Sequence, residues 1–427
     1  MRSTDSDGAS AGAGQNGSAS RHHQIQVPVD ALTLGMHVEE LDRPWTDVPV
    51  LFQRFVIRTE EQLSTLRHYC VWVWVDANAS ECDADWGAMA MKRGAVRTVH
   101  PLPEQHPLSE ELPRARKAYR KTRNYVDSLL ADIRNQQTIE LEEARPVIEA
   151  CATSIQANAN AMFWLGRVRS EDAYTAEHCV RVAILAIGFG SSLGLNDADL
   201  TTLGLCGLLH DIGKLRVPDA ILNKPGRLTP EEMAEMKRHT EYGYALLTKQ
   251  GDFDPIVQDT TLSHHERMDG RGYPGGKPGS CISRFTRIVT IVDAFDAMTS
   301  DRTYQKGVST ADALRILFKN RGDQFDAELV EHFIRMIGIY PPGSLVALNT
   351  GEVALVLANN PRYKLAPKVE VVLGPDRQPC RRRVLDLATH PESGDGTPYA
   401  ITEPLPDGAY GFSLQAHIEQ KGTASSS

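Results

Sequence analysis

Histidine and aspartate residues recur in a fixed order between residues 178 and 293 of this 427-residue chain. They lie in apolar segments such as YTAEHCVRVAILA and LTTLGLCGLLHDIGKL, which read as helices. Burying an imidazole or a carboxylate without a partner in such surroundings is costly. The series therefore favours a helical bundle in which these side chains meet in the interior. Its members are His178, His210, Asp211, His239, His264, His265 and Asp293.

Taken singly, each of these positions has an ordinary interpretation, because a lone buried histidine is usually a hydrogen-bonded core residue. An ordered set of five histidines and two aspartates is better explained as a ligand set. Imidazole and carboxylate ligands suit iron, manganese, nickel or zinc. Two such ions bridged by a carboxylate clamp a phosphodiester and supply its nucleophile. The series predicts two divalent metal ions, with iron, manganese or nickel the expected identities.

The order of these residues resembles that of a known superfamily. His178, His210-Asp211 and Asp293 follow the H…HD…D pattern of the HD phosphohydrolases. The segments HDIGK, HHERMDGRGYP and DAFDAMTSDRTY are similar to those of the HD-GYP subfamily, and the match covers about residues 150 to 345. The resemblance implies a mainly α-helical HD bundle and a metal-dependent phosphodiesterase that converts cyclic di-GMP, a bacterial second messenger, to linear 5′-pGpG.

The resemblance also assigns the metal ligands. One ion would be held by His178, His210, Asp211 and Asp293, and the other by Asp211, His239, His264 and His265. Asp211 would bridge the two ions, and a water between them would attack phosphorus. Some members hold a third ion with a glutamate four residues before the first histidine. This chain has Tyr174 at that position, so a two-metal site is expected.

Substrate contacts follow from the same resemblance. Lys214 would neutralise a phosphate oxygen in the transition state, and Arg302 matches a family arginine that binds substrate phosphate. The basic residue usual three positions after that arginine is Gln305 here, with Lys306 beside it as the expected contact. Tyr273 either stacks on a guanine or shapes the Gly-Tyr-Pro loop as a partner surface, and both interpretations stay open.

Composition disfavours several other classes of function. The formal net charge is −9 and no basic tract dominates, which argues against a nucleic-acid polymer as partner. The seven cysteines form no CxxC pair, so free thiols in a reducing cytoplasm are expected. The most apolar stretch, 180–189, is too short to span a bilayer, and the N-terminus lacks a signal-peptide segment. We expect a cytoplasmic protein without membrane contact.

Periodicity and composition divide the chain into six parts. A small α+β domain with the helix EEQLSTLRHY and the strand CVWVWVD is expected after a Ser/Gly/Ala-rich tail. This domain resembles the small one often found ahead of HD-GYP modules. Apolar runs around Asn349-Thr350-Gly351 predict a hairpin near the other end. The parts are a disordered tail (1–22), the α+β domain (23–80), a linker and connector helix (81–140), the HD-GYP domain (141–343), a β-rich extension (344–415) and a disordered tail (416–427).

Three alternatives to this function have different discriminating features. The same chemistry on 3′,3′-cyclic GMP-AMP stays open, because no residue identifies how the base is read. A non-catalytic receptor or adaptor would bind a cyclic dinucleotide, or a diguanylate cyclase (GGDEF) protein through the Gly-Tyr-Pro loop. The intact ligand set argues against that role. The segment HHERMDGRGYP disfavours a general HD nucleotidase, and no acidic phosphoacceptor pocket is recognisable in the N-terminal domain.

Overall fold

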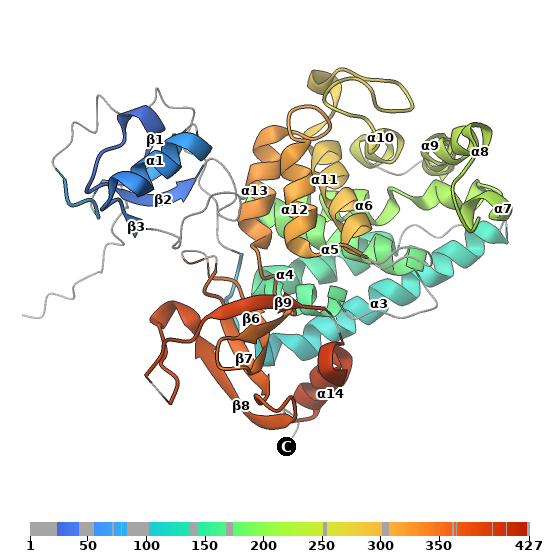
Figure 1. Ribbon diagram of the computed structural model, residues 1–427. Coiled ribbons are helices and arrows are strands. Elements are labelled where there is room, and N and C mark those ends of the chain that lie inside the picture. The colour runs from blue at the N-terminus through green and yellow to red at the C-terminus, as the bar shows by residue number, and fades with distance from the viewer. Residues whose placement is uncertain are drawn as a thin grey trace, which may run out of the picture. The chain divides into compact units, whose positions relative to one another are not determined.

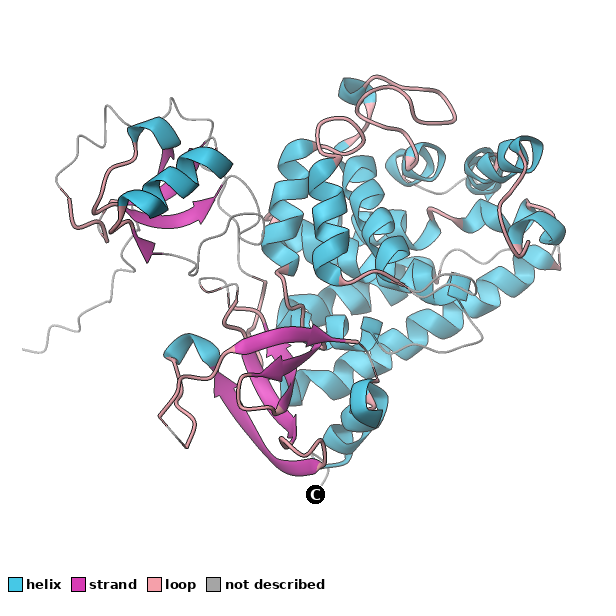
Figure 2. Ribbon diagram, viewed as in Figure 1, coloured by secondary structure: helices cyan, strands magenta, loops and turns pink. Residues whose placement is uncertain are grey.

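The computed structural model describes the chain in two compact units, divided between Val96 and Arg97 (Figures 1 and 2). The first unit combines strands with a helix, and the second is mainly helical with a sheet near its C-terminal end. The described residues are 24–41, 55–70, 72–77, 79–82, 102–135, 143–167, 174–250, 254–300, 307–360, 363, 365–394, 396–406 and 408–424.

The first unit is a four-stranded antiparallel sheet with a helix packed on it. Strand order is β1-β4-β2-β3. Helix α1 begins at Thr59, whose side chain forms a capping box with Gln62, and its Leu66 packs with Val38 and Val73 of the sheet. The predicted helix and strand are confirmed as α1 and β4. The elements are β1 Gln24–Pro28, β2 His37–Leu41, β3 Phe55–Val56, α1 Glu60–Tyr69 and β4 Trp72–Asp76.

The second unit is a helical bundle, which confirms the mainly α fold class. In the part of the chain that the structure describes, no helix is both long and apolar enough to cross a membrane. The longer helices are α3 Leu108–Arg134, α4 Ala144–Arg167, α5 Tyr174–Ser192, α6 Asp197–Leu209, α9 His239–Gln250, α11 Arg284–Thr299 and α13 Ala327–Ile337. The shorter ones are α7 Asp219–Leu222, α8 Pro230–Lys237, α10 Pro255–Ser263 and α12 Thr310–Lys319, with 3₁₀ turns η3 Ile212–Arg216 and η4 Gly279–Cys281.

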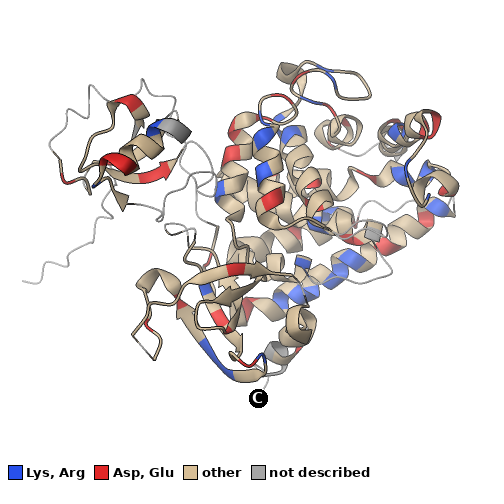
Figure 3. Ribbon diagram, viewed as in Figure 1, with Lys and Arg blue, Asp and Glu red and all other residues tan. Residues whose placement is uncertain are grey.

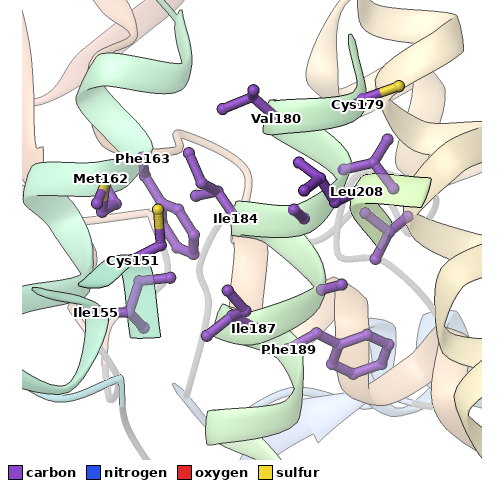
Figure 4. Packing of buried hydrophobic residues seen from close by; sticks show 14 of the residues in the cluster. Cys151, Ile155, Met162, Phe163, Cys179, Val180, Ile184, Ile187, Phe189 and Leu208 are labelled. Carbon is purple, nitrogen blue, oxygen red and sulfur yellow. The ribbon is translucent and has the colours of Figure 1, made fainter. Parts of the chain in front are cut away.

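Helix α5 lies at the centre of this bundle. Figure 4 shows Ile155 and Phe163 of α4 beside Ile184 and Ile187 of α5, and all four are buried. On the α6 side, a Cβ at Gly207 would come 2.9 Å from the Cα of Ala183 in α5, so only glycine permits this close approach. Because α5 is apolar nearly all round, it is held on several sides at once. This packing fixes the part of α5 that carries His178.

Helix α3 differs from the connector that its charged sequence predicts. Its side chains Leu112, Ala115, Val126, Leu129 and Ile133 are buried in the same apolar core as α4 and α5. The apolar positions recur at helical spacing beneath a charged surface, so the helix buries one stripe and exposes the other. Helix α3 is therefore an integral layer of the second unit.

The C-terminal part of the second unit is a five-stranded antiparallel sheet with strand order β8-β7-β6-β5-β9. The predicted hairpin is confirmed, with Gly351 at a positive φ of 81° in the turn between β5 and β6. The prediction of a disordered tail from 416 differs from the structure up to Ala424, because α14 buries Ile418 in the core. The elements are β5 Leu345–Leu348, β6 Val353–Ala358, β7 Lys368–Leu373, β8 Pro379–Asp386, β9 Ile401–Leu405 and α14 Leu414–Ala424.

Candidate metal centre

The structure brings all seven predicted ligand side chains together. Most of them lie at or beside helix ends, where the chain turns and the side chain projects inward. Five are buried, whereas His265 and Asp293 are partly exposed and mark the side open to solvent. Their positions are His178 in α5, His210 and Asp211 after α6, His239 at the start of α9, His264 and His265 after α10, and Asp293 in α11.

A helix boundary and a glycine explain the position of His239 beside the turn η3. The capping box of Thr229 and Glu232 starts α8, which ends at its C-cap residue Arg238, so that α9 begins at His239. Gly213 in η3 lies against this same turn. A Cβ at Gly213 would meet the carbonyl oxygen of His239 at 1.9 Å, so glycine is required for η3 to approach α9.

The carboxylate of Asp211 faces two pairs of histidines through different oxygens. Its Oδ2 lies 3.5 Å from Nε2 of His178 and 3.2 Å from Nε2 of His210. Its Oδ1 lies 3.4 Å from Nε2 of His239 and 3.6 Å from Nε2 of His264. A carboxylate that points one oxygen at each pair has the arrangement needed to bridge two cations.

The remaining two predicted ligands complete one pair each. Asp293 Oδ1 lies 3.1 Å from Nε2 of His178 and 3.6 Å from Nε2 of His210. The ring of His265 lies 4.1 Å from that of His264 and 5.1 Å from that of His239, between centroids. The set therefore divides into His178, His210 and Asp293 on one side of Asp211, and three histidines on the other.

Four of the histidines are oriented by acceptors behind them. In each, Nδ1 contacts an oxygen outside the cluster, which leaves Nε2 facing inward. His210 Nε2 and Asp211 Oδ1 are buried and have no hydrogen-bond partner within the described chain, although buried polar atoms are nearly always paired. These groups fit a metal centre. The Nδ1 acceptors are Asp296 Oδ2 for His178 (2.8 Å), and the carbonyls of Gly207 for His210 (2.8 Å), Met236 for His239 (2.7 Å) and Thr261 for His264 (3.0 Å).

Charges in the cluster also favour cation binding. Burial lowers the pKa of His239 to about 4, and burial holds the pKa of His265 well below its ordinary value. Burial works against ionisation of Asp211 and Asp293 as well, but the neighbouring cationic groups outweigh it and hold both carboxyl pKa values well below their usual range. Near neutral pH the rings of His239 and His265 are thus neutral and the carboxylates ionised, the forms that bind a metal ion. Burial also opposes protonation of His210 and His178, but the neighbouring carboxylates outweigh it, raise the pKa of His210 to about 9 and hold that of His178 well above its ordinary value, so these two rings would release a proton when an ion binds.

The predicted substrate contacts are only partly described. Lys214 lies in η3, and its ammonium donates a hydrogen bond to Asp211 Oδ2. The Tyr273 ring stacks on His265 with 4.7 Å between centroids and 29° between planes, and Lys237 Nζ lies 5.0 Å from the same ring. The predicted contacts of Arg302 and Lys306 fall in segment 301–306, outside the described residues.

Two residues behind His178 were missed by the sequence reasoning. Asp296 accepts from Nε of Arg181 at 2.7 Å and contacts His178 at 2.8 Å. Their signal was present in the spacing: Asp296 lies three residues after Asp293, and Arg181 lies three residues after His178. Residues three apart on a helix share a face, so both were candidates for the surroundings of the ligands.

Glu266 was also missed, although it follows His265 directly. Its buried carboxylate accepts hydrogen bonds from the backbone N–H groups of Gly275 at 2.7 Å and Lys277 at 3.0 Å. It therefore ties the segment after the Gly-Tyr-Pro sequence to the end of α10.

Substituting Glu266 with glutamine is expected to loosen this loop. The glutamine amide places an N–H donor against one of the two backbone donors, at a cost of about 1–3 kcal/mol. We expect faster hydrogen exchange of backbone amides in residues 268–280 of E266Q and a lower thermal midpoint. The exposed Glu231→Gln change is the matched control. Unchanged exchange in the loop would contradict this role.

Two described families match parts of the chain. The family described as "HD domain" matches residues 159–329, which include every residue of the cluster. The family described as "Domain of unknown function (DUF3391)" matches residues 24–144.

Individual known proteins are similar to the chain as well. It is 36% identical over 370 residues to the "Cyclic di-GMP phosphodiesterase PA4108" of Pseudomonas aeruginosa. The aligned region covers 85% of this chain and 88% of that protein. It is 37% identical over 174 residues to the "3'3'-cGAMP-specific phosphodiesterase 3" of Vibrio cholerae, covering 41% of this chain and 38% of that one. A solved structure, an HDG"Y"P protein of Bdellovibrio bacteriovorus, aligns with a TM-score of 0.45 at 18% identity and covers 73% of this chain and 98% of that chain.

Proposed function

The chain belongs to the HD-GYP family of HD-domain phosphodiesterases, and on that premise we propose that it hydrolyses cyclic di-GMP to linear 5′-pGpG with two divalent metal ions. One observation carries the proposal: each oxygen of Asp211 faces a different pair of histidines. A phosphodiesterase that uses two ions needs this arrangement, whereas a histidine-rich structural core does not.

The chain's own residues would divide the work. Bound ions supply Lewis acidity and an activated water for attack on phosphorus. Asp211 would contribute one oxygen to each ion, and the acceptors behind four of the rings keep their Nε2 atoms directed into the cluster, where they would hold the ions. The first ion is assigned to His178, His210, Asp211 and Asp293, and the second to Asp211, His239, His264 and His265. Tyr174 at the start of α5 supports two ions rather than three, because a phenol replaces the carboxylate of three-metal members.

We infer the substrate contacts from the residues around the cluster and from the family pattern. We propose that Lys214 binds a phosphate oxygen, because its side chain is 29% exposed and its ammonium pairs with Asp211, the proposed bridging carboxylate. Arg302 and Lys306 are proposed for further phosphate contacts by the family pattern alone. Because the Tyr273 ring is stacked on His265, we propose that it lines the metal centre and does not stack on a guanine of the substrate. We propose a cytoplasmic location, which the seven free thiols support.

Anaerobically purified protein provides the main test. Metal analysis should give two ions per chain, and cyclic di-GMP should yield 5′-pGpG. Turnover of 3′,3′-cyclic GMP-AMP in parallel separates the two substrates. A His210→Ala variant purified in the same way should be inactive, which excludes a contaminating enzyme. Metal-loaded protein that hydrolyses neither dinucleotide would overturn the proposal and favour a receptor or an adaptor for GGDEF proteins.

Removing the ammonium of Lys214 should lower kcat more than it affects metal binding. We expect K214M to lose about 10²-fold in kcat, the size typical for one group that stabilises charge in the transition state. Metal content should stay at the wild-type value. Lys224, which pairs with Glu232 at 2.6 Å, offers the control K224M. A K214M variant with wild-type kcat would remove Lys214 from the proposed mechanism.

A further inference from the structure

A chain of alternating charges connects the metal centre to helix α3. Oδ2 of Asp296 lies 2.8 Å from Nδ1 of His178, and its Oδ1 lies 2.7 Å from Nε of Arg181. Arg181 Nη1 lies 3.6 Å from Glu177 Oε2, and Glu177 Oε1 lies 3.0 Å from Nη1 of Arg123. The series therefore runs from a predicted ligand in α5, through α11 and back to α5, and ends on α3.

Burial makes the members of this series depend on one another. Glu177 and Asp296 are each 3% exposed and Arg181 is 8% exposed, whereas the Arg123 side chain is 29% exposed. A buried charge is tolerated when a partner of opposite sign compensates its lost hydration. Removing Arg123 takes away the cation at the solvent end and leaves Arg181 to neutralise both Glu177 and Asp296. The guanidinium would then be drawn from Asp296 toward Glu177.

Helix α3 is well placed to control this series. Figure 3 shows Lys and Arg residues spaced along α3, and within the described chain Arg123 is the one with an ion pair to α5. Tyr119, one turn before Arg123, has a buried hydroxyl and a pKa raised to about 12 by burial and by Glu177. This face of α3 therefore lies against the charged series. Among the described residues, helix α3 is also the first helix of the second unit in chain order.

We propose that Arg123 is a positioning residue of the metal centre, which acts through Glu177, Arg181 and Asp296 to fix the ring of His178. The packing of α3 on α5 is thereby coupled to metal affinity on the His178 side of Asp211. Groups that orient a metal-ligating histidine set its affinity for the ion, even though they do not touch the ion. The inference rests on the proposed function in taking His178 as a ligand.

The test compares three variants, R123M, E177Q and the double variant R123M/E177Q, with the control variant R120M. Arg120 lies on α3, is exposed, and has no ion pair within the described chain, so R120M controls for loss of a charge from this helix. Metal affinity is measured by competition with a chelator, using Mn²⁺ as the probe, beside thermal unfolding and kcat at saturating Mn²⁺. Direct partners of a ligating histidine affect affinity about 10–100-fold, so we expect a loss of up to about tenfold for this more distant residue.

The expected pattern is specific. R123M weakens Mn²⁺ binding, and R123K restores part of the affinity. E177Q and the double variant R123M/E177Q bind nearly as the wild type does, because without the Glu177 carboxylate Arg181 stays on Asp296. R120M binds as the wild type does, and kcat at saturating Mn²⁺ is retained throughout. A lower thermal midpoint with unchanged Mn²⁺ affinity would show that Arg123 has only a structural role and would overturn the inference. Should R123M not fold, R123Q and R123K carry the same comparison.

Failure of the proposed function gives a different result. In that case wild-type protein itself fails to bind two ions or to hydrolyse a cyclic dinucleotide. If wild-type protein does both and R123M matches it in Mn²⁺ affinity, only the role of Arg123 is lost.

Discussion

Asp211→Asn is expected to abolish hydrolysis, with a fall in kcat/KM of at least about 10³-fold. The change removes the one negative charge shared by the two histidine pairs and points an amide N–H at one of them. Metal-ion catalysis supplies several kcal/mol of transition-state stabilisation, and each 1.36 kcal/mol is a factor of about ten in rate. Product formation from cyclic di-GMP and metal content per chain measure the two consequences together, and both should fall.

The control for this change is an aspartate that lies outside the cluster and whose side chain is half exposed. Asp312 pairs with Arg315 at 2.6 Å, and both side chains are half exposed, so D312N should retain full activity and two ions. If D211N kept two ions and wild-type turnover, Asp211 would not be the bridging ligand. The division of the seven side chains into two sets would then be wrong.

The cluster could be predicted from the sequence because six of its seven members carry a local signal, and only His239, in the polar stretch KRHTEYG, depends on the order of the series alone. His178 and Asp293 are polar residues in strongly apolar helices, and the dipeptides His210-Asp211 and His264-His265 follow apolar runs. Burial of such groups needs a partner, and their fixed order resembles a known family. The prediction that these side chains converge depends on residue type and order. It therefore holds even where the predicted end of a helix is wrong.

Most features that could not be predicted from the sequence depend on contacts between residues far apart in the chain. The spacing of Glu177 and Arg181 is visible in α5, but nothing in that helix indicates that Arg123, more than fifty residues earlier, lies against them. The charged stretch of α3 suggested a connector because its buried stripe is narrow. In the C-terminal segment, few apolar residues precede the tail, so burial of Ile418 gives almost no sequence signal.

Local geometry accounts for the remaining differences. The sequence between Pro230 and Gly243 contains no further glycine or proline and so gives no local sign that a helix ends there. The helix nevertheless ends at Arg238, where the backbone of His239 packs closely against Gly213 of η3. The orientation of Tyr273 likewise depends on the ring of His265 beneath it, and a sequence cannot specify which side of a loop an aromatic ring covers.

Replacing Arg181 with methionine is expected to destabilise the second unit strongly. The arginine makes two hydrogen bonds to Asp296, at 2.7 and 3.0 Å, and is 3.6 Å from Glu177. Burial alone would raise the pKa of Asp296, but Arg181, followed by His178, holds it below its ordinary range. R181M leaves two buried carboxylates without this cation. Breaking a buried ion pair by removing one partner costs about 3–5 kcal/mol, and we expect a loss of that size.

Chemical denaturation of R181M, with and without Mn²⁺, measures the loss as a lower midpoint at an unchanged slope. The matched control is R315M, because the exposed Arg315–Asp312 pair should contribute no more than about 1 kcal/mol. Combining R181M with Asp296→Asn should recover part of the loss, since neutralising the stranded carboxylate removes the charge that Arg181 compensated. A single-variant loss below about 1 kcal/mol would mean that water reaches Asp296 and Glu177. The charged series would then not be a buried unit, and its link from α3 to His178 would have no energetic basis.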